Sequence, residues 1–236
     1  MAVLEGFHAV KHALRFGAEL QELVTRDAAA LAELAAALAP ELAARLAVAH
    51  EVEPELFERL APMPPATGVI AIAARPRREL GELLRDRSPS PLVLLENPRD
   101  LGNLGACVRV AAGADAAGLL STGSHDPWHP DSVRGAAGLH FALPVLRIDS
   151  LARLEDLPRP LLALDPEGEQ LDPRSLPAEA ILAFGTERDG LSDELLRRAD
   201  GRLRIPMRAG VSSLNLATSV AAVLFAWRLS GGAAPG

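Results

Sequence analysis

The sequence predicts an α/β protein with two domains of unequal size. Between residues 91 and 230, short apolar segments alternate with segments of helical spacing, which is typical of a mostly parallel sheet covered by helices. Residues 1–76 combine one helix-like segment, Ala-rich stretches and short β candidates, which indicates a small α/β domain. We therefore predict domains at 1–76 and 91–230, joined by a Pro-rich and charged linker at 77–90.

The larger domain should alternate strands and helices. The strands are expected at 91–96, 116–122, 143–148, 160–165, 180–185 and 201–206. The helices are expected at 103–113, 131–138, 149–155, 191–199 and 212–229. Ligands of such a sheet bind beyond the carboxyl ends of its strands. The loops that should carry a functional site are therefore 97–103, 185–191 and 206–214.

The smaller domain should begin with a helix, because Phe7, Val10 and Leu14 recur at helical spacing and Gly17 is typical of a helix end. One or two Ala-rich helices should follow, interrupted near Pro40. The β candidates are 22–25, 45–52 and 69–74. A short helix is expected within the linker, and the tail at 231–236 should be disordered.

Composition limits the classes of partner. The net charge of −7 is unfavourable for a nucleic-acid-binding protein, so an RNA site would need a local patch of arginines. Composition alone favours an enzyme that acts on small molecules. No apolar run reaches the roughly 18 residues that span a bilayer, and Glu5 interrupts the pattern of a signal peptide. We therefore expect a cytoplasmic protein without membrane contact.

Metal binding is not expected. Cys107 is the single cysteine, which excludes an internal disulfide and a multi-cysteine metal site. The histidine pairs at 8/12 and 125/129 have the i, i+4 spacing of zinc ligands, but a third ligand is missing. Prolines also interrupt the second pair, so its two rings need not share a face.

Three motifs follow expected strands. In "NLGACVR", Asn103 can cap a helix, Gly105 allows close packing, and Arg109 lies six residues after the asparagine. In "GTERDGLSDE", Ser192 can cap a helix whose first turn is acidic and would repel a phosphate. In "IPMRAGVSSLN", Ser212, Ser213 and Asn215 can open an apolar helix. Each motif also has an ordinary structural explanation as a turn or a helix cap.

Taken together and in this order, the motifs resemble the SpoU (TrmH-type) class of RNA ribose 2′-O-methyltransferases in the SPOUT superfamily. The matching residues read N-x-G-x-x-x-R at 103–109, G-x-E-x-x-G at 185–190, and I-P-M followed by S-L-N at 205–207 and 213–215. The resemblance covers residues 91–229. More weakly, "LEGFHAVKHAL" and "TGVIAIAA" resemble the ribosomal-L30-like substrate-binding domain of that class.

The resemblance implies a trefoil knot in the larger domain, an S-adenosyl-L-methionine site within it, and a homodimer. It implies catalytic roles for Asn103, Arg109, Ser213 and Asn215. It also implies that the cofactor is held by Gly185, Glu187, Ile205, Met207 and Leu214. Arg134 is expected to contact an RNA phosphate, although a solvated helix residue would look the same. The L30-like domain favours rRNA over tRNA as substrate.

Other protein classes fit less well. A Rossmann-type dehydrogenase or a class I methyltransferase needs clustered glycines after the first strand and an acidic ribose ligand. Here Gly102 and Gly105 are spaced G-x-x-G, and no acidic residue has that placement. The alternative that stays open is a non-catalytic RNA-binding or ribosome-assembly protein on the same fold.

Overall fold

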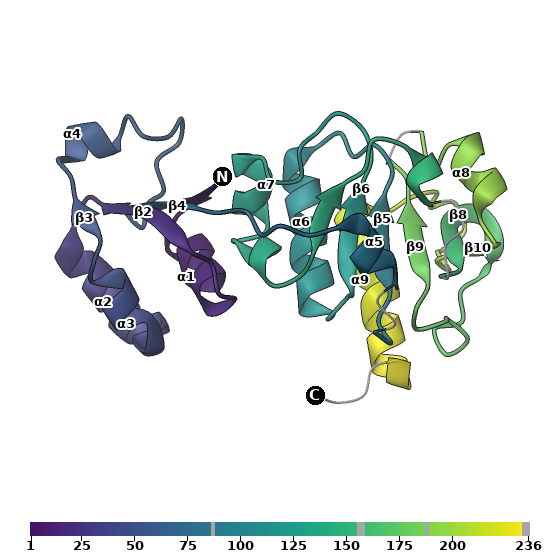
Figure 1. Ribbon diagram of the computed structural model, residues 1–236. Helices are drawn as coiled ribbons and strands as arrows, with labels where there is room; N and C mark the ends of the chain where they lie inside the picture. The colour runs from purple at the N-terminus through teal and green to yellow at the C-terminus, as the bar shows by residue number, and fades with distance from the viewer. Residues whose placement is uncertain (86–87, 155–158, 187–188, 233–236) are drawn as a thin grey trace.

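The computed structural model describes residues 1–85, 88–154, 159–186 and 189–232, and contains two sheets, each with its own helices (Figure 1). The smaller sheet has the order β1-β4-β2-β3 and the larger has the order β10-β8-β9-β5-β6-β7. An extended segment that carries α5 (Leu80–Arg85) connects the two. In the part of the chain described, no helix is long and apolar enough to cross a membrane.

The smaller sheet is built from the first 73 residues. Its elements are β1 (Ala2–Glu5), α1 (Phe7–Arg15), β2 (Leu20–Thr25), α2 (Ala28–Leu38), η1 (Pro40–Leu42), α3 (Ala43–Leu46), β3 (His50–Glu51), α4 (Pro54–Phe57) and β4 (Val69–Ala73). The predicted interruption near Pro40 is confirmed. The predicted strand at 45–52 is wrong over most of its length, because α3 extends to Leu46 and only His50 and Glu51 pair with β2. The sequence did not indicate β1 or α4.

The larger sheet contains all six predicted strands, and every pair in it is parallel. Its strands are β5 (Leu92–Leu95), β6 (Gly118–Ser121), β7 (Val145–Arg147), β8 (Leu161–Gln170), β9 (Ile181–Phe184) and β10 (Gly201–Arg204). Its helices are α6 (Leu101–Gly113), α7 (Pro130–Gly135), α8 (Asp193–Arg198) and α9 (Leu216–Trp227). Shorter turns of helix are η2 (Leu139–Phe141), η3 (Leu151–Leu154) and η4 (Arg228–Gly232). The knotted path of the chain stays a prediction.

Two predicted helices differ from the structure for local reasons. The last helix starts at Leu216 and not at residue 212, because the side chain of Asn215 caps it. The helix predicted at 149–155 is a 3₁₀ turn, η3, in its described part. The first two residues of the predicted disordered tail, Gly231 and Gly232, continue from α9 as η4; residues 233–236 lie outside the described residues.

The central strands β5 and β9 are buried over their whole length, and their side chains serve both faces of the sheet. Val93 and Leu95 pack with residues of α6 and α9, whereas Leu92 and Leu94 pack with residues of α5 and α8. Fully burying such a side chain contributes about 1.5–3 kcal/mol. The predicted linker is therefore not free of the fold, since Leu83 of α5 belongs to this second layer.

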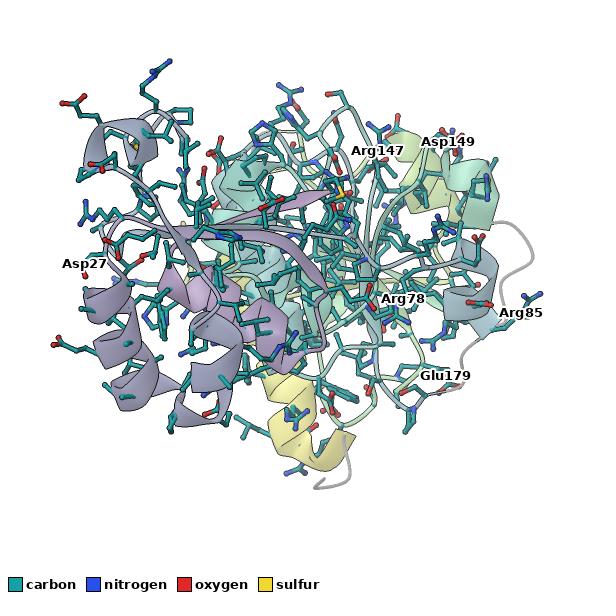
Figure 2. All side chains as sticks on the ribbon, turned by 60° about the vertical axis from the view of Figure 1, so that its left-hand side comes forward. Asp27, Arg78, Arg85, Arg147, Asp149 and Glu179 are labelled. Atoms are coloured by element: carbon teal, nitrogen blue, oxygen red, sulfur yellow. The ribbon has the colours of Figure 1, made fainter. Side chains whose placement is uncertain are left out.

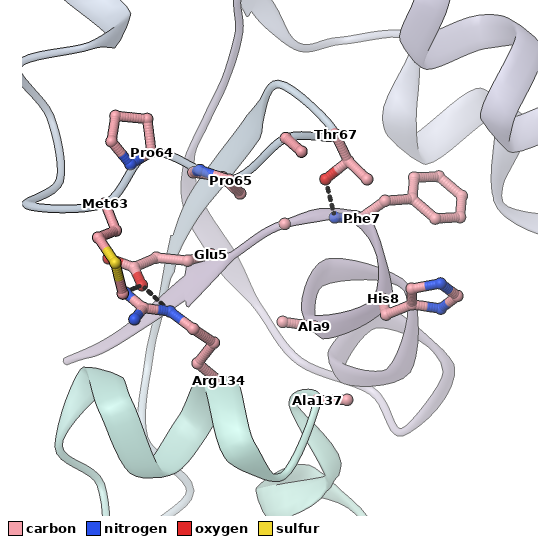
Figure 3. A pocket seen from close by; sticks show the side chains of 12 residues that line it. Glu5, Phe7, His8, Ala9, Met63, Pro64, Pro65, Thr67, Arg134 and Ala137 are labelled. Carbon is pink, nitrogen blue, oxygen red and sulfur yellow. Dashed lines mark hydrogen bonds and ion pairs between the residues drawn. The ribbon is translucent and has the colours of Figure 1, made fainter. Parts of the chain in front are cut away.

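The two sheets are fastened together where α7 and η2 meet β1 and α1. Nδ1 of His12 donates to the carbonyl of Ala137 at 2.8 Å. A Cβ on Gly138 would overlap the backbone of Ala9, so glycine permits this close approach. Arg134 donates to the buried carboxylate of Glu5, with 2.8 Å between Nε and Oε2 (Figure 3). One continuous apolar cluster includes side chains from both sides of this junction.

His140 is fully buried at the same junction, beside Trp128, with ring centroids 4.9 Å apart. Its Nε2 donates to the carbonyl of Pro127 at 2.7 Å, so the neutral ring carries its proton there. Its Nδ1 has no hydrogen-bond partner among the described residues. Burial lowers the pKa of His140 to about 4, with the Pro127 carbonyl opposing that shift.

This histidine should make the fold sensitive to acid. Between about pH 6.5 and about pH 4, His140 binds a proton in the unfolded chain but stays neutral in the native state. The free energy of unfolding therefore decreases as pH falls through this range. The loss should reach roughly 3 kcal/mol by pH 4. His140→Gln, which keeps a donor for Pro127, should remove this component of the pH dependence. Urea unfolding of both proteins at pH 7, 5.5 and 4 measures it; parallel pH profiles would contradict the assignment.

Candidate active site

One pocket of about 720 Å³ lies at the carboxyl end of the larger sheet. The middle of β8, the loop that follows β9 and the loop between β10 and α9 line it, and we call it the loop pocket. Four of the five predicted cofactor residues line it: Gly185, Ile205, Met207 and Leu214. Ser213 lines it as well. The fifth predicted cofactor residue, Glu187, lies outside the described residues.

The walls of the loop pocket combine apolar and charged groups. Leu164, Phe184 and Leu203 contribute apolar surface. Asp165 and Glu167, in the middle of β8, contribute carboxylates that the sequence analysis did not single out, and Arg204 and Arg208 also line the pocket. Such a wall suits a ligand with an apolar body that also carries charged groups.

The loop after β9 is shaped by close backbone contact. Thr186 and Gly190 form a bridge, with hydrogen bonds of 3.1 and 3.2 Å between their backbone groups. A Cβ on Gly185 would overlap the backbone of Gly190, so any other residue at position 185 would force this loop open. Gly190 itself has a φ of 65°, which glycine adopts without strain.

The loop after β5 is tied to the loop after β9 by charged side chains. Arg99 pairs with Asp189 at 2.9 Å. The carboxylate of Glu96 accepts hydrogen bonds from the backbone N–H of Ser192 at 2.7 Å and from its hydroxyl at 2.6 Å. Ser192 also caps α8, as predicted. Because these two loops follow neighbouring parallel strands, acidic and basic residues directly after each strand are the sequence signal that could have indicated this link.

Asn103 does not cap α6, contrary to the sequence prediction. Asp100 is the cap, and its carboxylate accepts from the backbone N–H of Asn103 at 2.6 Å. Aspartate is as good a cap as asparagine, and the two are three residues apart, so capping preference alone could not separate them. The side chain of Asn103 therefore does not cap the helix. The predicted close packing of Gly105 is confirmed, since a Cβ there would overlap the carbonyl of Ser132.

Asn215 joins the first motif to the third. Its Oδ1 accepts from the backbone N–H groups of Ala217 and Thr218 at 3.0 and 3.3 Å, which caps α9. Its Nδ2 is then turned outward and donates to Oδ1 of Asn103 at 3.0 Å. One side chain therefore starts α9 and connects α6 to the loop that lines the loop pocket.

The two predicted arginines lie outside the lining of the loop pocket. Arg109 is exposed on α6 and has no hydrogen bond or ion pair with a described residue. Arg134 is engaged by Glu5 and, at 3.3 Å, by Asp131, so its guanidinium joins the domains. Its role in RNA binding stays a prediction. Cys107 is buried in the core. Among the described residues, no group of three side chains has the arrangement of a metal site.

Comparison with known proteins defines the class of this chain. The profile of the SpoU rRNA Methylase family matches residues 90–225, more than half of the sequence. A 23S rRNA (uridine(2479)-2′-O)-methyltransferase of Streptomyces viridochromogenes is 29% identical over 80% of this chain, which spans 65% of that relative. A 23S rRNA (guanosine(2553)-2′-O)-methyltransferase of Bacillus subtilis, RlmP, is 27% identical over 97% of this chain and 88% of its own length.

Comparison with a crystal structure also relates this chain to SpoU methyltransferases. The SpoU methyltransferase AviRb from Streptomyces viridochromogenes, solved with AdoMet, superimposes with a TM-score of 0.78 at 26% identity and covers 97% of this chain and 89% of its own. The fold and the motifs thus define a SPOUT-type α/β protein. The chain belongs to the SpoU rRNA methylase family.

The double role of Asn215 can be separated by substitution. Asn215→Ser should keep a good helix cap but lose the bond to Asn103, because the serine side chain is too short to reach it. Asn215→Ala should lose both, and it should lower the free energy of unfolding by about 1 kcal/mol. Denaturant unfolding of the wild type and both variants measures this. Equal destabilisation by serine and alanine would mean that the Asn103 bond, and not the cap, holds α9 in place.

Proposed function

We propose that the protein transfers a methyl group from S-adenosyl-L-methionine to the 2′-hydroxyl of a ribose in structured RNA, with rRNA favoured over tRNA. The observation that carries the proposal is the loop pocket. Two of the three family motifs line it, and the Asn103–Asn215 hydrogen bond attaches the first motif to it. Both relatives described above are named as 23S rRNA 2′-O-methyltransferases, which supports rRNA as the substrate.

The loop pocket suits this cofactor. Its volume lies in the range of small-molecule sites, about 300–1,000 Å³. Its apolar wall can cover the adenine ring, and the carboxylates of Asp165 and Glu167 favour the positive sulfonium and ammonium groups. The residues that would hold the cofactor are Gly185, Glu187, Ile205, Met207 and Leu214. When bound, the cofactor supplies an electrophilic methyl carbon.

The residues of the chain must then align and deprotonate the ribose hydroxyl. Asn103, Ser213 and Asn215 would position the ribose at the mouth of the pocket. The guanidinium of Arg109 is a poor base, because its pKa exceeds about 12. It would instead hold the neighbouring RNA phosphate and stabilise the negative charge that develops on the hydroxyl oxygen. The proton would pass to that phosphate or to water.

We also propose that the two domains of the chain have different functions. Residues 1–76 would form an L30-like domain that binds the RNA substrate, and residues 91–230 would form the knotted methyltransferase domain. Because the whole chain carries a net charge of −7, RNA contact would have to be concentrated where cations are grouped and acids are absent.

The active form is proposed to be a homodimer through α9. Most apolar residues of this helix, including Val220, Leu224 and Trp227, are buried within the chain and cannot supply an interface. The candidates that remain are Phe225 of α9 and Leu229 of the adjoining η4, which are 39% and 86% exposed. Apolar side chains of this size at the surface of neighbouring helical turns are typical of a protein contact.

The molecular mass in solution, measured by light scattering, tests the proposed homodimer. At micromolar concentration the wild type should have twice the mass of one chain. Phe225→Glu together with Leu229→Glu should give a monomer, because two buried charges would oppose association. The matched control is Leu56→Glu together with Leu60→Glu, at exposed apolar positions of the smaller domain, which should leave the mass doubled. A wild type that is monomeric, or a charged α9 variant that still dimerises, would refute this interface.

Substitution of Arg109 tests the proposed mechanism of methyl transfer. Arg109→Ala should leave the fold and the affinity for S-adenosylmethionine nearly unchanged, because the side chain is exposed and lies outside the loop pocket. Single-turnover methylation should fall by about a hundredfold or more, the effect of losing one transition-state donor. Arg109→Lys should recover little, because an ammonium group does not reproduce a planar fork of donors.

The control for this test is Arg153→Ala, which removes an exposed arginine of η3. An ordinary exposed helical arginine changes stability by less than about 0.5 kcal/mol when replaced. If Arg109→Ala transfers methyl groups as fast as Arg153→Ala, the catalytic role belongs to another residue.

A further inference from the structure

Helix α1 carries positive charge only, in a chain whose net charge is negative. Its apolar residues, such as Phe7, Val10 and Leu14, are buried in the core. Its ionisable residues are His8, Lys11, His12 and Arg15, and the helix contains no acid. A cationic stretch of this kind attracts anions to one part of an otherwise acidic protein.

Lys11 is the only lysine of the chain, and its side chain is 9% exposed. It has no hydrogen bond or ion pair with a described residue, yet its ammonium nitrogen is not among the fully enclosed polar atoms. Burial and the nearby Arg15 lower the pKa of Lys11, and Glu41 opposes this. An ammonium group on a buried stem with no partner is costly unless an anion reaches it.

His8 is exposed on the same helix. Helix α1 packs against η2, and η2 packs against α6 of the larger sheet. Burial, then the charges of Lys11 and Arg109, lower the pKa of His8. His8 and Arg109 therefore lie on two helices that pack against the same turn, η2, at the domain junction. Figure 3 shows the His8 ring extending from α1 away from the Glu5–Arg134 pair, so that carboxylate does not neutralise it.

The position of α1 relative to α6 is fixed. The hydrogen bond from His12 to the carbonyl of Ala137 holds the helix against the larger sheet. Arg15 is not available as a ligand, because it is paired with Glu41 at 2.7 Å and also donates to the carbonyl of Leu38. Among the described residues of α1 and α6, the basic side chains without a hydrogen bond or ion pair are thus His8, Lys11 and Arg109.

We propose that His8 and Lys11 of α1, together with Arg109 of α6, form one phosphate-binding surface that holds the RNA backbone beside the nucleotide to be methylated. This rests on the proposed function for the identity of the anion. Two cations and a histidine that a phosphate can protonate, contributed by two domains, suit the negative charge of a nucleic-acid backbone. His8 and Lys11 act here as positioning residues, and Arg109 contacts the reacting nucleotide.

The surface gives RNA binding a defined dependence on pH. A phosphate would raise the pKa of His8 from its lowered value towards or above its ordinary one, so binding takes up a proton. RNA affinity should therefore increase as pH falls from about 8 to about 6. The charged groups that face His8 are Lys11 and Arg109, and those that face His12 are Lys11, His8 and Arg15. None of these is an acid that could mask the effect.

The test is binding of the full-length protein to an unmodified 23S rRNA transcript over a series of salt concentrations at pH 6 and pH 8. Lys11→Met keeps the apolar stem and should weaken binding about fivefold to tenfold near 0.1 M salt, with a slope of log Kd against log salt that is smaller by about one. His8→Ala, at an exposed position that leaves folding unaffected, should remove most of the pH dependence. Calorimetry should show unchanged affinity for S-adenosylmethionine in both variants.

The matched control is Arg85→Ala, which removes one exposed charge on α5; Figure 2 shows Arg85 on the other side of the view from Asp27 of the smaller domain. It should bind RNA with the affinity and salt slope of the wild type. If Lys11→Met and His8→Ala also match the wild type, the phosphate surface is wrong, even if methyl transfer proceeds. Absence of methyl transfer by the wild type would instead count against the proposed function, because the binding comparison does not depend on it.

Discussion

The in-register parallel pairing of β5 with β9 is the constraint on which the site depends. Leu95 lies opposite Phe184, so two strands far apart in the sequence end at the same level. The loops that follow them are therefore neighbours, and Glu96 and Arg99 of the first can hold Ser192 and Asp189 of the second. A shift of one residue would turn the buried side chains of both strands to the wrong face. The hydrophobic core thus fixes the geometry of the polar site above it.

The third motif is connected by a single polar side chain rather than by the sheet. Asn215 uses its oxygen to start α9 and its amide nitrogen to bond Asn103. Because α9 packs against α6 on one face of the sheet, the two asparagines are also supported from below by apolar contacts. The geometry of the proposed ribose site then follows from packing, capping and one hydrogen bond.

Much of the fold could be predicted from the sequence, because apolar runs of strand length alternate with helical spacing. The errors lie where two good residues compete for one role or where an element is very short. Asp100 and Asn103 are equally suited to cap α6, and only the backbone at residue 100 decides between them. The carboxylates of Asp165 and Glu167 could not be assigned to the pocket, since their place depends on how β8 runs beside β10. The contact of α1 with η2 links distant segments that no periodicity relates.

The domain junction combines structural and electrostatic roles in one region. Glu5 neutralises Arg134 and thereby holds β1 to α7, whereas Lys11 of α1 and Arg109 of α6 form no ion pair with a described residue. An acidic protein can bind RNA when its positive charge is concentrated in this way.

The central claim is transfer of a methyl group to a ribose hydroxyl of rRNA. The most direct measurement supplies S-adenosylmethionine labelled in its methyl group with unmodified 23S rRNA or with tRNA, and then maps the labelled nucleotide. We expect label in 23S rRNA, on a ribose 2′-oxygen at one position. Label on a base, or no transfer to either RNA by a protein that binds the cofactor, would contradict the account.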